Sequence, residues 1–222
     1  SKVFDNTYRA VNIALVNELM MFCDKMNINV WEVSDAASTK PFGIQTFYPG
    51  PGVGGHCIPV DPFYLSWKAR QFDFSTKFIE LAGEINIQVS YYVVSKVIEA
   101  LNGKGKAVKG SRIMVLGITY KKDVADLRES PALKIIKELE DKGAEVVFFD
   151  PYVPMFSGYE VVTNAKRVEL TEWELSQSDC VLIITDHSNV DYEQVTAGAN
   201  LVVDTRNATK NISAGREKVV LI

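Results

Sequence analysis

The chain has few of the residues that cross-link small secreted domains. Its 222 residues include two histidines and three cysteines, Cys23, Cys57 and Cys180. The cysteines lie far apart and form no CxxC pair, so we expect neither a disulfide scaffold nor a bound metal. A sparse, odd set of cysteines is typical of a reducing compartment, and we therefore expect a cytoplasmic protein with free thiols.

The chain also lacks long runs of a single character. It has no long basic run and its formal net charge is -4, which disfavours nucleic acid as the main partner. No apolar stretch is long enough to span a bilayer and no signal peptide is visible, so we expect no membrane insertion. Hydrophobic residues at 47% and charged residues at 23% are ordinary for a globular protein.

Helical spacing dominates the first half of the chain. Apolar residues recur every three or four positions over residues 3–23, and further helices are predicted over 30–38 and over about 75–102. The composition then changes in GKGKAVKGS, residues 103–111, which we interpret as a linker. We therefore expect a central helical domain over residues 1–102, whose long last helix contributes a dimer contact.

Strands and helices alternate in the second half, residues 112–222. The short apolar runs RIMVLG, EVVFFD, CVLIIT, NLVVD and KVVLI are rich in β-branched residues and predict strands. Ser130 is placed to cap a helix with Pro131 in its first turn, and Thr171 and Glu174 form a capping box for another. The fold class is thus α/β, with an all-helical domain followed by a Rossmann-like domain built on a doubly wound parallel sheet.

The loop FYPGPGVGGHCIPVDPFYL, residues 47–65, contains a potential dinucleotide-binding pattern. The spacing G-x-G-x-x-G is met at Gly50, Gly52 and Gly55. A dinucleotide turn must lead from a strand into a helix, and we expect Pro59 and Pro62 to break the first turns of any helix here. We therefore do not interpret this loop as an NAD-binding turn.

The same loop is well suited to presenting a reactive thiol. Glycines let the backbone approach a ligand closely, and prolines stiffen it, so a loop with both can hold one side chain in place. Cys57 is the most nucleophilic candidate, whereas Cys23 and Cys180 lie in apolar segments and are interpreted as small buried residues. A buried structural role is the alternative for Cys57. His56 is adjacent, but neighbours in sequence often point apart, so we leave it out of the predicted site.

The loop, the first helix and GITYKKDVADLRES (117–130) together resemble the UDP-glucose/GDP-mannose dehydrogenase family. The resemblance covers essentially the whole chain and is greatest to members acting on UDP-N-acetylhexosamines, especially UDP-N-acetylglucosamine. It corresponds to the family's central domain and C-terminal nucleotide-sugar domain, without the N-terminal NAD-binding domain. The resemblance implies oxidation of a sugar C6 alcohol to a carboxylate with two NAD, through a cysteine thiohemiacetal and thioester.

The resemblance also implies roles for four catalytic residues. Cys57 matches the nucleophile, and Lys2 and Asn6 match a K-x-x-x-N pair that stabilises the developing oxyanion, the lysine also favouring the thiolate. Asp61 matches an aspartate that activates the hydrolytic water or orients the lysine. The alternatives are a solvated charge for Lys2, a helix-cap amide for Asn6 and a turn-forming role for Asp61.

Contacts to the nucleotide sugar are implied for five residues. They are Tyr48, Gly54, Tyr120, Lys121 and Arg206. A lysine offsets phosphate charge, and an arginine can make paired hydrogen bonds to it. Asp150 ends the second predicted strand, where an NAD domain places its ribose acid, but no glycine fingerprint precedes it. We interpret Asp150 as a strand-end cap.

The leading hypothesis is a two-domain part of a UDP-N-acetylglucosamine 6-dehydrogenase that forms a homodimer or a higher homo-oligomer. NAD would bind chiefly to the domain that this sequence lacks, so the chain alone should reduce no NAD⁺. UDP-N-acetylmannosamine, UDP-glucose and GDP-mannose are the alternative substrates. A hypothesis of a different class is a non-catalytic module for nucleotide-sugar binding or dimerisation, in which Cys57 would be inert.

Overall fold

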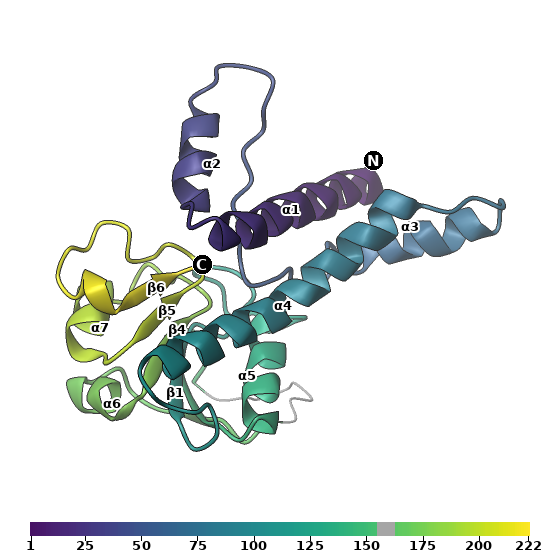
Figure 1. Cartoon of the computed structure of the whole chain (residues 1–222). Helices are drawn as coiled ribbons and strands as arrows, with labels where there is room; N and C mark the ends of the chain where they lie inside the picture. The colour runs from purple at the N-terminus through teal and green to yellow at the C-terminus, as the bar shows by residue number, and fades with distance from the viewer. Residues whose placement is uncertain (155–162) are drawn as a thin grey trace.

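The computed structural model describes residues 1–154 and 163–222 (Figure 1). The first half is helical, as predicted. Its helices are α1 (Lys2–Lys25), α2 (Val30–Ser38), α3 (Asp61–Arg70) and α4 (Lys77–Gly103). The helices expected over 3–23, 30–38 and 75–102 are therefore confirmed with small shifts of their ends.

The second half is a six-stranded parallel sheet in the order β3-β2-β1-β4-β5-β6. The strands are β1 (Arg112–Leu116), β2 (Glu145–Phe149), β3 (Lys166–Arg167), β4 (Cys180–Ile183), β5 (Val202–Asp204) and β6 (Val219–Leu221). The connecting helices are α5 (Pro131–Asp141), α6 (Glu172–Gln177), α7 (Tyr192–Gly198) and the 3-10 turn η1 (Arg216–Lys218). This strand order confirms the predicted doubly wound sheet.

Side chains alternate between the two faces of the sheet, as a strand requires. On β1, Ile113 and Val115 face a core shared with α4 and α5, whereas Met114 and Leu116 face a second core shared with α6 and α7. All four are fully buried. Helices therefore cover both faces of the sheet, and α4, which belongs to the first half of the chain, covers one of them.

The long helix α4 joins the two halves. It packs against α1 and reaches α5 and the sheet with its C-terminal half (Figure 1). The residues that make this contact recur at helical spacing and are buried: Val89, Val93, Val94, Val97 and Leu101. These apolar residues of α4 are thus buried by contacts within the chain. The large hydrophobic residues of α4 that stay exposed are Phe78, Leu81, Ile87 and Tyr91, and a dimer contact through this helix stays a prediction.

Helix α3 was not predicted. Pro62 occupies its first turn, where the missing N–H has no partner to lose, so the expectation that Pro62 would break a helix here is wrong. The loop is nevertheless not a dinucleotide turn, because no strand precedes it: residues 40–54 contain none. The loop leads from irregular backbone into a helix and lacks the strand that a Rossmann turn needs.

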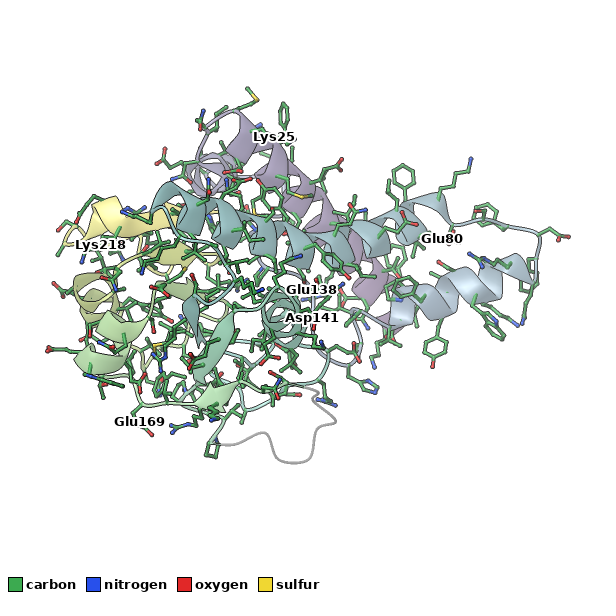
Figure 2. The ribbon with its side chains drawn as sticks, turned by 60° about the horizontal axis from the view of Figure 1, so that its bottom comes forward. Lys25, Glu80, Glu138, Asp141, Glu169 and Lys218 are labelled. Carbon is green, nitrogen blue, oxygen red and sulfur yellow. The ribbon has the colours of Figure 1, made fainter. Side chains whose placement is uncertain are left out.

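Helix α3 and the start of α4 form a hairpin that projects away from the sheet (Figure 1). Glu80, labelled in Figure 2, pairs with Arg70 across the hairpin at 3.2 Å. Aromatic side chains at its end are exposed: Phe72, Phe74 and Phe78. The hairpin therefore presents an apolar surface that this chain does not cover.

Asp150 caps the end of β2. Its carboxylate is fully buried and accepts hydrogen bonds from the N–H groups of Ile118 at 2.7 Å and Tyr152 at 2.8 Å, and from Nε2 of His187 at 3.0 Å. Burial acts to raise the pKa of Asp150, but the bonds from His187 and the backbone outweigh it, so the pKa lies below its ordinary value. Asp150 is therefore held ionised by the fold, in agreement with the cap that we expected.

We predict that Asp150→Ala lowers the free energy of unfolding by about 3–5 kcal/mol, because it leaves several buried donors without a partner. Urea denaturation at neutral pH measures the loss. Asp141→Ala is the control, since Asp141 (labelled in Figure 2) is an exposed member of an i,i+4 pair with Lys137 and should change stability by less than about 0.5 kcal/mol. Equal stability of the two variants would contradict the cap.

The same comparison has a predicted pH dependence. Because the folded-state pKa of Asp150 is lowered, its stabilising effect is complete above the ordinary value of 3.8 and is lost as the pH falls through the lower folded value. The gap between wild type and Asp150→Ala should therefore narrow below pH 3.8.

Candidate functional site

The predicted catalytic residues come together where α1 begins and α3 begins. Nδ2 of Asn6 donates a 2.7 Å hydrogen bond to Oδ2 of Asp61, 55 residues further along the chain. Lys2 lies one helical turn before Asn6. The pKa of Lys2 is raised first by its hydrogen bond to the Cys57 side chain, and then by its electrostatic interactions with Cys57 and Asp61. All four predicted residues therefore belong to one cluster.

The backbone around Cys57 connects the thiol loop directly to α3. The carbonyl of Cys57 accepts the N–H groups of Val60 at 3.1 Å and Asp61 at 2.8 Å. The thiol is half-buried, and its Sγ lies 3.8 Å from Nδ1 of His56. The expectation that these two neighbouring side chains point apart is therefore wrong. Contact between the imidazole and the sulfur makes His56 a further group beside the thiol.

The glycines of the loop pack against the C-terminal half of the chain. A Cβ atom at Gly50 would lie 2.5 Å from Nη1 of Arg206, and one at Gly54 would lie 2.5 Å from Cβ of Tyr120. Gly55, with φ +90°, has a Tyr120 ring carbon 2.9 Å from its ideal Cβ position. A larger residue would collide at Gly54, because Cβ of Tyr120 and the carbonyl of Glu129 cannot move away, whereas at Gly50 the close atoms belong to the movable end of Arg206. Gly54 therefore first makes room for the sheet domain. Sequence reasoning had assigned that room to a ligand.

Three of the predicted substrate contacts, Gly54, Tyr120 and Arg206, meet where the loop packs against the sheet domain. Tyr120 and Arg206 lie against Gly54 and Gly50, and Nε of Arg206 donates to Oδ1 of Asp186 at 3.1 Å. Lys121 follows Tyr120 and is exposed. An arginine and an aromatic ring therefore lie next to the thiol loop, a combination that suits a phosphorylated ligand.

Tyr48 makes its contacts with α2. Its ring stacks on Trp31 with centroids 5.8 Å apart, and its hydroxyl donates to Oδ1 of Asp35 at 2.7 Å, which raises the pKa of Tyr48. Nε1 of Trp31 in turn donates to the carbonyl of Ile222 at 2.9 Å. These contacts fix the entry to the loop against α2 and the end of β6. A role of Tyr48 in substrate binding stays a prediction.

A cavity of about 860 Å³ adjoins the loop. Its walls come from both halves of the chain: His56 and Ile58 beside Cys57, Phe63 from α3, Asn86 from α4, and Pro131 with Lys134 from α5. The volume is within the range of small-molecule sites. The residues on either side of Cys57, His56 and Ile58, thus line this cavity.

The described residues do not fit an NAD cofactor. After β1, the turn at Gly117 has no room for a ligand, since a Cβ there would lie 2.2 Å from the carbonyl oxygen of Thr185. Residues 118–130 are irregular and offer no helix N-terminus for a pyrophosphate, and Asp150 is occupied by the chain itself. The Rossmann-like topology is therefore present without its dinucleotide cradle.

Within residues 1–154 and 163–222, no group of three His, Cys, Asp or Glu side chains is placed to bind a metal ion. In the same residues, no helix combines the length and hydrophobicity needed to cross a membrane.

Sequence reasoning missed three polar residues that hold the start of the loop: Asn17, Asn86 and Ser90. A signal was present, because Asn17 follows Ala10 and Ala14 on the apolar face of α1. A polar residue at a position that the helical period assigns to the core needs a hydrogen-bond partner, and the loop supplies it.

We predict that Gly54→Ala destabilises the fold by about 1–3 kcal/mol, because its Cβ would overlap Tyr120 and the carbonyl of Glu129. Gly103→Ala is the matched control: it has no atom within 4 Å of the added Cβ and lies at the end of α4, so it should be neutral or stabilising. Thermal unfolding of both variants measures the difference. The junction would be wrongly described if Gly54→Ala were as stable as Gly103→Ala.

Comparison with known proteins assigns both halves to models of one family. Residues 1–88 match the UDP-glucose/GDP-mannose dehydrogenase family, central domain, and residues 114–211 match the UDP binding domain of the same family. The two matches are separated by the second part of α4 and the linker that follows it.

Curated relatives are similar along most of the chain. It is 40% identical to a UDP-N-acetyl-D-mannosamine dehydrogenase of Methanococcus maripaludis over 186 residues, which cover 84% of this chain and 40% of the relative. It is 35% identical to a UDP-N-acetyl-D-glucosamine 6-dehydrogenase of Salmonella typhi over 187 residues, with 84% and 43% covered. The chain thus spans about half or less of the length of these relatives.

A solved structure shares the fold. The UDP-D-ManNAc dehydrogenase from Pyrococcus horikoshii superposes with a TM-score of 0.82 at 30% sequence identity, covering 99% of this chain and 49% of the other.

Proposed function

The chain belongs to the UDP-glucose/GDP-mannose dehydrogenase family, and on this basis we propose that it carries the cysteine and the nucleotide-sugar site of a UDP-sugar 6-dehydrogenase. The observation that carries this proposal is the cluster of Lys2, Asn6 and Asp61 around Cys57. A nucleophile, a cation, an amide donor and a carboxylate are the groups that an oxidation through a thioester needs.

The proposed chemistry begins with the aldehyde formed from the C6 alcohol of the sugar. Sγ of Cys57 bonds to the aldehyde carbon, and the C=O electron pair moves to the oxygen, which takes up a proton to give a thiohemiacetal. Lys2 and the second amide N–H of Asn6 stabilise the negative charge as it develops on that oxygen.

The thiohemiacetal loses a hydride from its carbon and the hydroxyl proton to solvent, which gives a thioester. Water then hydrolyses the thioester to the carboxylic acid and the free thiol. Asp61 accepts the proton of that water. NAD⁺ supplies the hydride acceptor for both oxidations, and we propose that it binds outside the residues of this chain, since the described residues form no cradle for it.

We propose a UDP-N-acetylhexosamine as the substrate. The loop sequence favours UDP-N-acetylglucosamine, the leading hypothesis from the sequence. The higher identity to a UDP-N-acetyl-D-mannosamine dehydrogenase, 40% against 35%, favours the mannosamine epimer. The two sugars differ only in the configuration at C2. Because of the higher identity, we place the mannosamine first and the glucosamine second.

The oligomeric state and the cellular location are also proposals. We propose a cytoplasmic homodimer in which the exposed aromatic surface of the α3–α4 hairpin is covered by a second copy. Light scattering of the purified protein measures the mass, and a monomer at high concentration would refute the dimer.

We predict that Cys57→Ser in the full-length protein abolishes formation of the uronic acid, because a serine hydroxyl does not supply the thiolate that attacks the aldehyde. Acid formation from the UDP-sugar, followed by mass spectrometry, measures the loss. Cys23→Ser is the control, since Cys23 lies on α1 at the edge of the hydrophobic core, and it should keep its turnover. Near-normal turnover by Cys57→Ser would refute the mechanism.

The non-catalytic alternative predicts a different result for the same thiol. In a binding module Cys57 would react slowly with iodoacetamide and would not respond to UDP-sugar. In the proposed enzyme it reacts fast and is protected by bound UDP-sugar.

We predict that the full-length protein oxidises UDP-N-acetylmannosamine with the highest kcat/KM in a panel that also contains UDP-N-acetylglucosamine, UDP-glucose and GDP-mannose. NADH absorbance measures each rate. The highest kcat/KM for UDP-N-acetylglucosamine would support the substrate that we predicted from the sequence. The highest kcat/KM for UDP-glucose or GDP-mannose would refute both N-acetylhexosamine proposals.

A further inference from the structure

The start of the thiol loop is tied to the helical domain by buried polar side chains. The N–H of Gly50 donates to Oδ1 of Asn17 at 3.0 Å. Asn17 lies on α1 and is 0% exposed, so its side chain can contact neither solvent nor substrate. Its partner on the loop lies seven residues before Cys57.

Asn17 is itself held in one orientation. Its Nδ2 donates to Oδ1 of Asn86 on α4 at 3.1 Å, and Nδ2 of Asn86 donates to the carbonyl of Ala10 on α1 at 3.0 Å. The chain of bonds starts at a backbone N–H, which can only donate, and ends at a carbonyl, which can only accept. Neither amide can therefore be turned over without losing a bond at one end.

A second helix residue holds the next position of the loop. Oγ of Ser90 on α4 donates to the carbonyl of Pro51 at 3.0 Å, and Ser90 is 3% exposed. Further along, the N–H of Gly55 donates to the carbonyl of Arg128 in the sheet domain at 2.8 Å. Residues 50–55 of the loop are thus bonded at both ends, and Cys57 follows Gly55 by two residues.

Helix packing alone does not require these amides. An apolar residue at position 17 would also fill the contact between α1 and α4, and the neighbouring buried residues Ala10, Ala14 and Met20 are mostly small or apolar. An apolar residue would, however, leave the N–H of Gly50 buried without a partner. The amide pair is therefore explained by the loop that it binds.

We propose that Asn17, oriented by Asn86, is a positioning residue that sets where the loop presents Cys57 relative to Lys2 and Asp61. The kinetic consequence rests on the proposed function, whereas the geometric consequence does not. Asn17 acts through the backbone of Gly50 and touches none of the reacting atoms.

The test is Asn17→Leu in the full-length protein, a substitution of the same branched shape and larger volume that removes both hydrogen bonds. Two measurements are made. Alkylation of Cys57 by iodoacetamide, quantified on its peptide by mass spectrometry, should slow by about tenfold or more, because a displaced thiol loses the ammonium of Lys2. With UDP-N-acetylhexosamine, kcat should fall by about 10²-fold, with KM changed less than about threefold.

The matched control is Asn12→Leu. Asn12 lies on the same helix, and its Nδ2 donates at 2.7 Å to the carbonyl of Tyr8 within that helix, so its loss should leave alkylation and kcat unchanged. If circular dichroism shows that Asn17→Leu does not fold, Ser90→Ala decides instead. It removes the single bond to Pro51 and should slow alkylation by about fivefold.

Unchanged alkylation of Cys57 in folded Asn17→Leu, or in Ser90→Ala when the former is unfolded, would overturn the proposal. This outcome is distinct from failure of the proposed function. Full activity of Cys57→Ser would remove the function and leave the alkylation result standing. Normal alkylation in Asn17→Leu together with an inactive Cys57→Ser would remove the positioning role alone.

Discussion

The packing of α4 against two different partners is the constraint on which the rest of the structure depends. Its valine-rich face is buried against α1 at one level and against α5 and the sheet at another. Burying such a face contributes about 1.5–3 kcal/mol for each large side chain removed from water. Because one rigid helix carries both contacts, the start of α1, with Lys2 and Asn6, is fixed relative to the sheet domain, with Tyr120 and Arg206.

The thiol loop occupies the junction that this packing creates. Its glycines lie against the sheet domain, its first residues are bonded to α1 and α4, and its end becomes the first turn of α3. Asn6 and Asp61 close the cluster by a hydrogen bond between the two helices. The proposed nucleophile therefore lies on irregular backbone that contacts α1, α4 and the sheet domain and continues into α3. These contacts hold the thiol in one position, as a catalytic site requires.

Much of this arrangement was predictable, for identifiable physical reasons. The helices and the parallel sheet follow from periodicity, caps and β-branched runs, and the cluster of Cys57, Lys2, Asn6 and Asp61 follows from a specific motif. Helix α3 was missed because prolines were treated as breakers even where a first turn accepts them. The use of glycines for domain packing depends on distant partners, which local sequence does not reveal. The contact between Cys57 and His56 depends on the side-chain rotamers of two neighbouring residues, which their order in the sequence does not fix. The helical period marks Asn17 as a polar residue in the core, but it does not reveal that its partner is the N–H of Gly50.

The Rossmann-like half has the strand order of a dinucleotide-binding domain, but its described residues form no dinucleotide site. Asp150 stands at the end of β2, but it binds backbone N–H groups and His187, and the turn at Gly117 is closed by Thr185.

The thioester on Cys57 is tested most directly by mass spectrometry of Asp61→Asn full-length protein, acid-quenched during turnover of UDP-N-acetylhexosamine. We expect a sugar acyl group on the Cys57 peptide, because the substitution slows hydrolysis of the thioester. Continued acid formation with an unmodified Cys57 peptide would contradict it.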